Sequence, residues 1–206
     1  MAYGLRPVKG LSGGVQTGGS NEYPLVAGET DDIFVGDFLM WEANGFLARL
    51  GGETGISPTT TNDTTITVGV AGGFRWVNAA GEQKYGPYYL GDAGNTNCFV
   101  QVYDDPNQLF MVEADGVGAT TVQSDCGQNV PAINFATSAA NTTSGLSGMQ
   151  IDSSAAAVTA ALGLRLIAIV QDGENETRSG TQTSNVIVKI QSNCHAFGTG
   201  VVVAHG

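Results

Sequence analysis

Apolar and polar residues alternate along much of the chain, and the longest patterned stretch lies near its middle. Residues 97–114 read NCFVQVYDDPNQLFMVEA, in which two apolar-rich runs flank the tetrapeptide Asp104-Asp105-Pro106-Asn107. Runs rich in β-branched and aromatic residues are typical of strands. Proline presets φ at about −65°, and Asp and Asn side chains bond nearby backbone groups, so the tetrapeptide indicates a turn. Residues 97–114 are therefore predicted to form a β-hairpin around which the fold is organised.

Shorter apolar runs predict further strands on both sides of this hairpin. The Gly-Asp pair at 36–37 and the Gly-Gly pair at 72–73 are expected to bend or bulge two of them. Pro87 makes another an edge strand, because proline cannot donate to a sheet. Residues 153–161 have the only clear helix-forming composition, and their shortness predicts one turn or an irregular connection. The expected strands are residues 22–27, 33–41, 46–50, 66–77, 85–90, 132–135, 146–151, 162–170, 186–190 and 201–203.

The spacing of these runs predicts the fold class. Strands separated by polar connections are typical of a sandwich or barrel rather than of alternating strands and helices. The polar segments 51–65 and 172–184 contain no apolar run to bury and are expected to be exposed loops. A chain of 206 residues can bury a core without disulfides or metals. We therefore expect an all-β protein, with a single β-sandwich or β-barrel-like domain at 21–206 and an extended N-terminal arm at 1–20.

The N-terminal segment 1–20 is rich in glycine and poor in apolar residues, so it is predicted to lie outside the core as an extended arm. Arg6 and Lys9 are its charged side chains, and no acidic residue precedes Glu22. Two interpretations stay open: a frayed terminus, or an arm that becomes ordered along the surface of a partner. In the second interpretation the contacts come from Leu5, Arg6, Pro7, Val8, Lys9 and Leu11.

Composition and charge exclude several classes of partner. The formal net charge is −11, and the chain has only eight Lys and Arg residues. A duplex-DNA binder needs clustered basic residues to displace counterions, and an anionic membrane surface needs them too. The first residues lack the apolar region of a signal peptide, and no run reaches the ~18 apolar residues of a membrane helix. We expect no nucleic-acid partner and no membrane partner.

Cysteine and histidine are too few and too scattered to indicate a reactive site. Cys98, Cys126 and Cys194 are an odd number and far apart, which is not a disulfide framework and favours a reducing compartment. Cys194-His195 resembles a nucleophile and base, but adjacent residues on a strand point to opposite faces. Zinc needs about four suitably spaced ligands, and these residues provide no such set. A structural role is expected for His195.

Carboxylates are the remaining candidates for chemistry. Asp104 and Asp105 can offer oxygen ligands to a cation, although no further ligand follows at a recognisable spacing. A glycosidase would need two carboxylates across a cleft with aromatic platforms, which Asp104, Asp105 or Glu113 with Trp41 or Trp76 could supply in principle. No phosphate-binding loop and no nucleophile elbow occurs. We expect no catalytic activity, no cofactor and no metal.

Several segments, taken in order, resemble a group of tailed-bacteriophage structural proteins. That group has Gly-Leu-Arg-Pro-Val near its start, then a Tyr-Pro strand, a Phe-x-Gly-Asp step and Val-Tyr-Asp-Asp-Pro. The matching segments here are residues 3–14, 21–28, 33–39, 102–113, 163–172 and 185–201. The resemblance implies a virion structural protein, made in the host cytoplasm. It further implies a capsid decoration (cement) protein on the outer surface of the phage head, which stabilises contacts between subunits of the major capsid protein.

The resemblance also implies a homotrimer. Trp41, Phe74 and Trp76 are the candidate residues for a subunit interface, although their apolar character favours a core position for each of them. The alternative function is a carbohydrate- or receptor-binding β module of a virion, in a head fibre or tail component. That alternative predicts Trp or Tyr side chains exposed at the loops.

Overall fold

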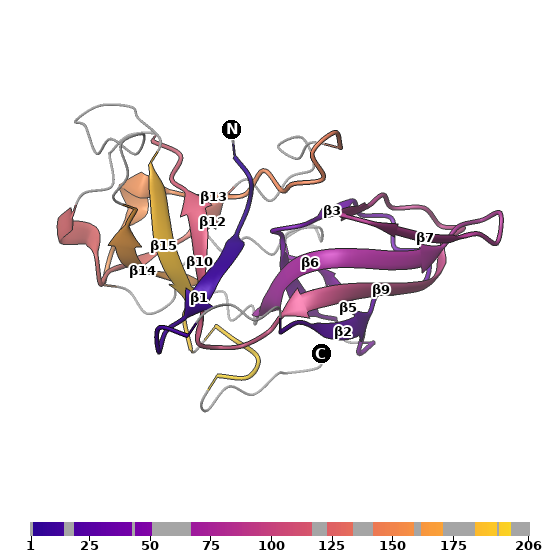
Figure 1. Ribbon diagram of the computed structural model, residues 1–206, viewed down its shortest axis with the longest axis horizontal. Coiled ribbons are helices and arrows are strands. Elements are labelled where there is room, and N and C mark those ends of the chain that lie inside the picture. The colour runs from indigo at the N-terminus through magenta and orange to yellow at the C-terminus, as the bar shows by residue number, and fades with distance from the viewer. Residues whose placement is uncertain are drawn as a thin grey trace.

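The computed structural model describes residues 2–14, 19–42, 44–50, 67–116, 123–133, 142–158, 162–170, 184–192 and 194–198. These residues form antiparallel sheets in a sandwich-like arrangement, and within them no sheet closes into a barrel (Figure 1). The all-β prediction is confirmed. Among the same residues, no helix is long and apolar enough to cross a membrane. The expected loop at 51–65, most of that at 172–184 and the expected strand at 201–203 lie outside the described residues.

The larger sheet has six strands in the order β2-β9-β6-β4-β5, with β7 also paired to β6. The long strand β6 pairs along one edge with β9, and along the other edge first with β4 and then with β7. Its register against β9 shifts between Ala71 and Gly73, so the bulge predicted at 72–73 is confirmed. The strands are β2 (Asn21–Pro24), β4 (Phe38–Trp41), β5 (Leu47–Arg49), β6 (Thr67–Val77), β7 (Gln83–Gly86) and β9 (Thr96–Tyr103).

A two-stranded ribbon of β3 (Ile33–Phe34) and β8 (Tyr88–Tyr89) lies beside this sheet. A break that is visible in the sequence separates each of these strands from the neighbouring strand along the chain. Gly36, at φ +97°, divides β3 from β4, and Pro87 divides β7 from β8. Because β7 pairs only with β6 and β8 only with β3, the expected edge position of 85–90 is confirmed.

The other large sheet has five strands in the order β1-β10-β15-β14-β11. A second ribbon, β12 with β13, lies beside it, and β13 is followed by one turn of 3-10 helix, as expected for 153–161. The elements are β1 (Arg6–Gly10), β10 (Gln108–Glu113), β11 (Asn129–Val130), β12 (Ala132–Ile133), β13 (Gln150–Ile151), β14 (Leu164–Ile169), β15 (Asn185–Ile190), and the 3-10 helices η1 (Gln123–Asp125) and η3 (Ser153–Ala155).

The predicted hairpin at 97–114 is wrong, although both of its strands and its turn exist. Strand β9 pairs with β2 and β6, whereas β10 pairs with β1 and β15. The turn at 104–107 therefore carries the chain from one large sheet to the other (Figure 1). Asp105 accepts a hydrogen bond from the Asn107 amide at 2.8 Å, so the turn chemistry was correct and only the strand pairing differs.

The N-terminal segment is not a free arm, which corrects the boundary expected at residue 20. Residues 6–10 form the edge strand β1, paired antiparallel with β10. Leu5 is only 1% exposed, and its amide donates to the Gly36 carbonyl at 3.1 Å. Gly4, at φ +68°, allows this approach, since a Cβ there would lie 2.6 Å from that of Ser147. Burial of Leu5 thus outweighs the flexibility of the glycines that follow.

Two hydrophobic cores lie on opposite faces of the six-stranded sheet. The core between the large sheets, called the shared core here, takes Phe38 and Val70 from the six-stranded sheet and Phe110 and Val188 from the five-stranded one. The second core lies between the six-stranded sheet and the β3–β8 ribbon, where Tyr89 is fully buried. Alternate residues of β4 enter opposite cores because neighbouring side chains of a strand point to opposite faces.

Candidate functional site

The six N-terminal residues predicted to bind a partner divide into buried and exposed members. Leu5 belongs to the shared core and is unavailable to a partner. Pro7 is half-buried. The other four are exposed on or next to the edge strand β1, with Val8 at 38% and Leu11 at 49% exposure. These four residues, Arg6, Val8, Lys9 and Leu11, are called the β1 edge below.

The β1 edge carries positive charge that no described carboxylate pairs with. Arg6 lies 4.8 Å from the ring centroid of Tyr3, a cation–π contact that orients its guanidinium. Within the described part of the chain, neither Arg6 nor Lys9 forms an ion pair. Arg75 and Lys84, by contrast, have carboxylate partners at 2.6 and 2.7 Å.

The backbone of β1 is poorly suited to pairing with a further strand. Pro7 has no N–H to donate, and the register against β10 shifts between Pro7 and Lys9. Proline, lysine and a bulge are features that protect edge strands from adding another chain. A partner at the β1 edge would therefore contact side chains rather than extend the sheet.

The three aromatic residues proposed for a subunit interface differ in their surroundings. Phe74 is 5% exposed within the second core, so it cannot contribute to an interface. Trp41 and Trp76 are half-buried, and each packs edge-to-face on a tyrosine at a centroid distance of 5.6 Å. The partners are Tyr23 for Trp41 and Tyr89 for Trp76. Both tryptophans belong to the six-stranded sheet, on different strands.

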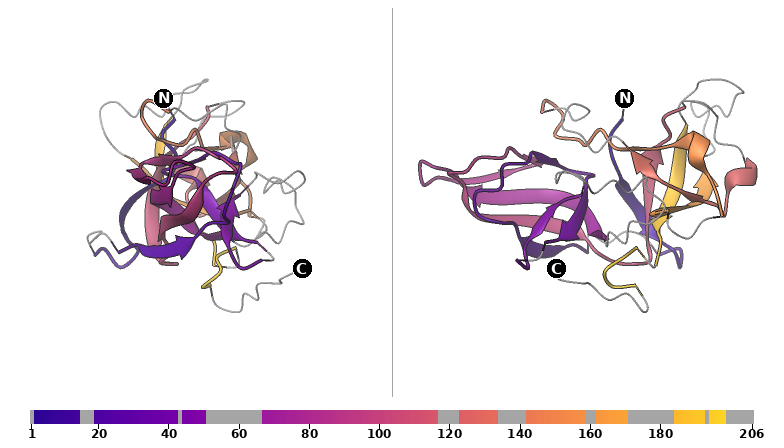
Figure 2. Two further views of the ribbon diagram at one scale, coloured as in Figure 1. Left: turned by 90° about the vertical axis from the view of Figure 1, so that its right-hand side faces the viewer. Right: turned by 180° about the vertical axis from the view of Figure 1, so that it is seen from behind.

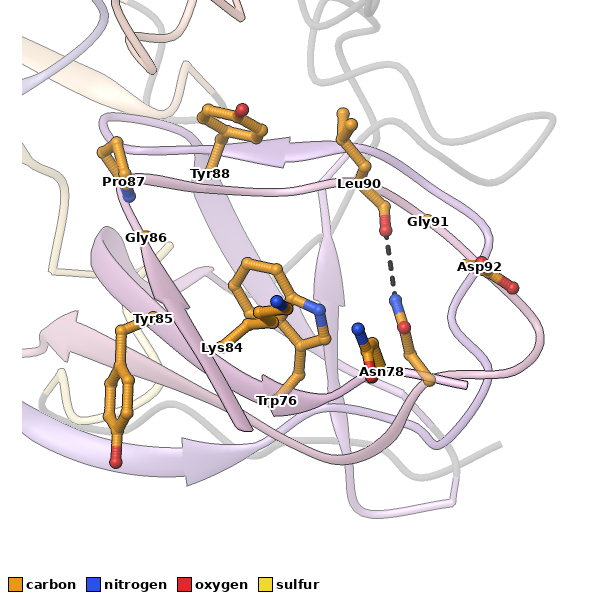
Figure 3. Close-up of a pocket in the computed structure, with 11 residues that line it drawn as sticks. Trp76, Asn78, Lys84, Tyr85, Gly86, Pro87, Tyr88, Leu90, Gly91 and Asp92 are labelled. Carbon is orange, nitrogen blue, oxygen red and sulfur yellow. Dashed lines mark hydrogen bonds between the residues drawn. The ribbon is translucent and has the colours of Figure 1, made fainter. Parts of the chain in front are cut away.

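A hollow of about 630 Å³ lies beside Trp76, between strand β7 and the segment 86–92 (Figure 3). Trp76 and Lys84 occupy its middle, as expected for residues paired across β6 and β7. Asn78 lies toward one end of the hollow. Asn95 also lines the hollow, and its side-chain amide donates to the Leu90 carbonyl at 3.3 Å. The hollow thus combines the aromatic side chains of Trp76, Tyr85 and Tyr88 with side-chain amides and the segment 86–92.

The carboxylates considered for catalysis or cation binding either accept hydrogen bonds within the fold or are buried in it. Asp104 accepts hydrogen bonds from Tyr23 at 2.6 Å and Asn21 at 2.8 Å, and burial raises the pKa of Tyr23 together with this bond. Glu113 is buried on β10, in the other sheet from Trp41 and Trp76. No group of three or more His, Cys, Asp or Glu residues suited to a metal occurs among the described residues.

Cys194 and His195 are placed as parts of the fold rather than as a reactive pair. His195 is fully buried, and its Nδ1 accepts a hydrogen bond from the Phe197 amide at 3.1 Å. Backbone bonds join both neighbours of this histidine to Thr67 at the start of β6. Burial raises the pKa of the Cys194 thiol and lowers the pKa of the His195 imidazole. Both shifts oppose a thiolate–imidazolium pair, which reactive cysteines use.

Two features were missed by reasoning from sequence. One is the hollow, whose walls depend on the break at Pro87 and on the register of β6 with β7. The other is Asp37, a buried carboxyl that accepts hydrogen bonds from Ser147 and from the Phe34 amide. Burial raises the pKa of Asp37 to about 6. The only feature of the sequence that indicated Asp37 was the presence of an acidic residue inside an apolar run.

Comparison of the chain with models of protein families, with curated proteins and with solved structures finds no match.

Proposed function

We propose that this protein is a virion structural protein that decorates the outer surface of a tailed-phage head, and that the β1 edge attaches it to the major capsid protein. The order of the phage-like sequence segments supports the first part. The second part rests on one observation: in a chain of net charge −11, Arg6 and Lys9 are exposed on an ordered strand and have no ion-pair partner among the residues that the structure describes. A capsid surface with exposed carboxylates would complement them.

Attachment through the β1 edge would cost little conformational entropy, because this edge is already ordered in the folded protein. A disordered arm loses roughly 1–2 kcal/mol of backbone entropy per residue when it becomes ordered on a partner. Strand β1 is already fixed by its pairing with β10, so this cost has been met in the folding of the protein. Val8 and Leu11 add exposed apolar surface beside the two cations. Binding would stabilise contacts between capsid subunits wherever one copy touches two of them.

Self-association as a homotrimer is part of the same proposal. Trp41 stays a candidate for the subunit interface because it is half-buried in a single copy, whereas Phe74 is buried in the second core and Trp76 lines the hollow. Light scattering of the purified protein, and its copy number on the particle, would test the trimer. A monomer in both measurements would contradict it.

Co-sedimentation with phage heads lacking the protein tests attachment. The variant Arg6→Ala/Lys9→Ala should lower occupancy by about tenfold at subsaturating protein, as the loss of two charge contacts permits. The matched control is Arg75→Ala/Lys84→Ala, which removes the same charge from residues that are ion-paired within the protein. Binding of the wild type should weaken with added salt, and the first variant should be less sensitive to it.

Equal occupancy for the two double variants would contradict attachment through the β1 edge. Failure of the wild type to co-sediment with any such head would contradict decoration itself. Thermal unfolding of each variant, measured beforehand, shows that all the proteins compared are folded.

A further inference from the structure

Strand β7, which forms one wall of the hollow beside Trp76, lies at the end of the six-stranded sheet remote from β1 (Figure 1), so the hollow is separate from the proposed attachment edge. Figure 2 shows the same separation from behind, with the two large sheets at opposite ends of the molecule. We propose that this hollow is a binding site for a neutral saccharide. The proposal goes beyond head decoration and does not depend on it.

Size and shape favour a small ligand of one or two sugar rings. A volume of about 630 Å³ falls within the usual range of small-molecule sites. One wall is strand β7, and the facing wall is largely backbone from 86–92, on the side of β8 away from β3 (Figure 3). A Cβ at Gly86 would stand 3.3 Å from the Tyr88 carbonyl oxygen and 3.5 Å from the indole Cη2 of Trp76, so a larger side chain there would narrow the hollow.

Trp76 provides a fixed aromatic surface in this hollow. Its ring packs edge-to-face on Tyr89, with an interplanar angle of 85°. Tyr89 is itself fully buried and donates a hydrogen bond to the Glu29 carbonyl at 3.2 Å. An oriented, half-exposed indole can receive the apolar C–H face of a sugar ring without losing further side-chain entropy. The indole N–H makes no hydrogen bond within the described residues and is therefore available to a hydroxyl group.

The polar groups around Trp76 select for hydroxyls rather than for charge. Lys84, the cation of the hollow, is held by Glu82 at 2.7 Å, and Asp92 adds another carboxylate. This balance disfavours phosphate and carboxylate ligands, which would meet more negative than positive charge. A wholly apolar ligand would leave the indole N–H of Trp76, which has no partner among the described residues, without water or a replacement partner. A ring with apolar faces and neutral hydroxyls satisfies both conditions.

The two tryptophans allow a matched experiment on the isolated full-length protein. The probes are immobilised neutral oligosaccharides of glucose, galactose, mannose and N-acetylglucosamine, with sialylated and sulfated oligosaccharides as the charged comparison. The best neutral binder is then titrated, as free sugar, into two variants. Trp41→Phe leaves Trp76 as the sole indole, and Trp76→Phe leaves Trp41, which packs on Tyr23 in the same edge-to-face geometry.

Binding should change the fluorescence of the Trp41→Phe variant saturably and leave that of Trp76→Phe unchanged. Trp76→Ala should weaken binding by at least about tenfold, the size of an aromatic contact, while Trp41→Ala leaves it within about twofold. If Trp76→Ala does not fold, Gly86→Val serves in its place, because it fills the hollow beside the intact indole. Absence of neutral-sugar binding, a preference for charged glycans, or equal binding by the Trp76 and Trp41 variants would each overturn the proposal.

Discussion

The two large sheets differ in how the chain builds them. The six-stranded sheet comes from one continuous stretch, residues 21–103, and two of its five strand pairings, β4–β5 and β6–β7, are closed by short turns. The five-stranded sheet comes from residues 108–190, with β1 as its one strand from elsewhere. The turn at 104–107 is thus a boundary between two halves of the sequence, which β1 crosses in one direction and residues 194–196, bonded to Thr67 of β6, cross in the other.

The halves are nevertheless not independent. Phe38 and Val70 of the six-stranded sheet pack in the same core as Phe110 and Val188 of the five-stranded sheet. Leu5, just before β1, enters that core as well. Contiguous assembly gives each sheet local connections, and the shared core joins the sheets into one cooperative structure.

Surface features differ between the sheets in the same way. The five-stranded sheet ends in β1, with two unpaired cations. The six-stranded sheet has its exposed cations in ion pairs and instead bears the hollow at Trp76. We infer that the two ends of the molecule have different roles, with attachment at one end and a ligand-binding site at the other.

The largest predicted effect tests whether the sheets unfold together. Phe110→Ala removes a fully buried ring from the shared core and should lower the free energy of unfolding by roughly 3–5 kcal/mol. Both tryptophans, Trp41 and Trp76, lie in the six-stranded sheet, so their fluorescence reports that sheet alone. In urea, fluorescence and circular dichroism should shift together to one lower midpoint.

The control for this experiment is Phe46→Ala, because Phe46 is 36% exposed at a turn and should change stability far less. A fluorescence midpoint that stays at its wild-type value in Phe110→Ala would show two independently folding halves, contrary to a shared core.

The next effect in size concerns the N-terminal strand. Leu5→Ala should destabilise the protein by about 2–4 kcal/mol, because a buried leucine leaves a cavity in the shared core. Leu11→Ala, at an exposed leucine only six positions away, should stay within about 0.5 kcal/mol. Urea unfolding of both variants measures the difference. Equal, negligible effects would restore the interpretation of residues 1–20 as a frayed arm.

A smaller, pH-dependent effect is predicted for Asp37. Burial raises its folded-state pKa to about 6 from the ordinary value of 3.8, so the folded protein favours the protonated carboxyl. The stabilising contribution is complete below about pH 4 and is lost as the pH rises through 6, a change of roughly 2–3 kcal/mol. Asp37→Asn keeps a neutral, hydrogen-bonding side chain and should lack this component.

The measurement is the free energy of unfolding of wild type and Asp37→Asn at pH 4.5 and pH 7. The wild type should lose stability relative to the variant between these two pH values. Other carboxyls titrate in both proteins, so their effect cancels in the difference and only that of Asp37 remains. An unchanged difference between the two proteins would show that Asp37 titrates normally.

Local features of the fold could be predicted from the sequence because local chemistry determines them. The bend at Gly36, the bulge at 72–73 and the break at Pro87 follow from residues that restrict or free the backbone. The pairing of β9 and β10 could not be predicted, since a turn at 104–107 suits a hairpin and a crossing between sheets equally well. Glycines after residue 9 likewise concealed the burial of Leu5.

The candidate sites show the same limit. The charges of Arg6 and Lys9 were visible in the sequence, but their lack of ion-pair partners is a property of the folded molecule. Trp76 and Lys84 are eight residues apart and become neighbours only through the register of β6 and β7. Site prediction failed wherever it needed contacts between strands rather than the order of residues.

The orientation of the protein on a decorated phage head tests the central claim most directly. Cryo-electron microscopy of such heads should place the β1 edge, with Arg6 and Lys9, against acidic residues of the major capsid protein. The hollow at Trp76 should face outward. A reconstruction in which the six-stranded sheet meets the shell and β1 faces solvent would contradict the account.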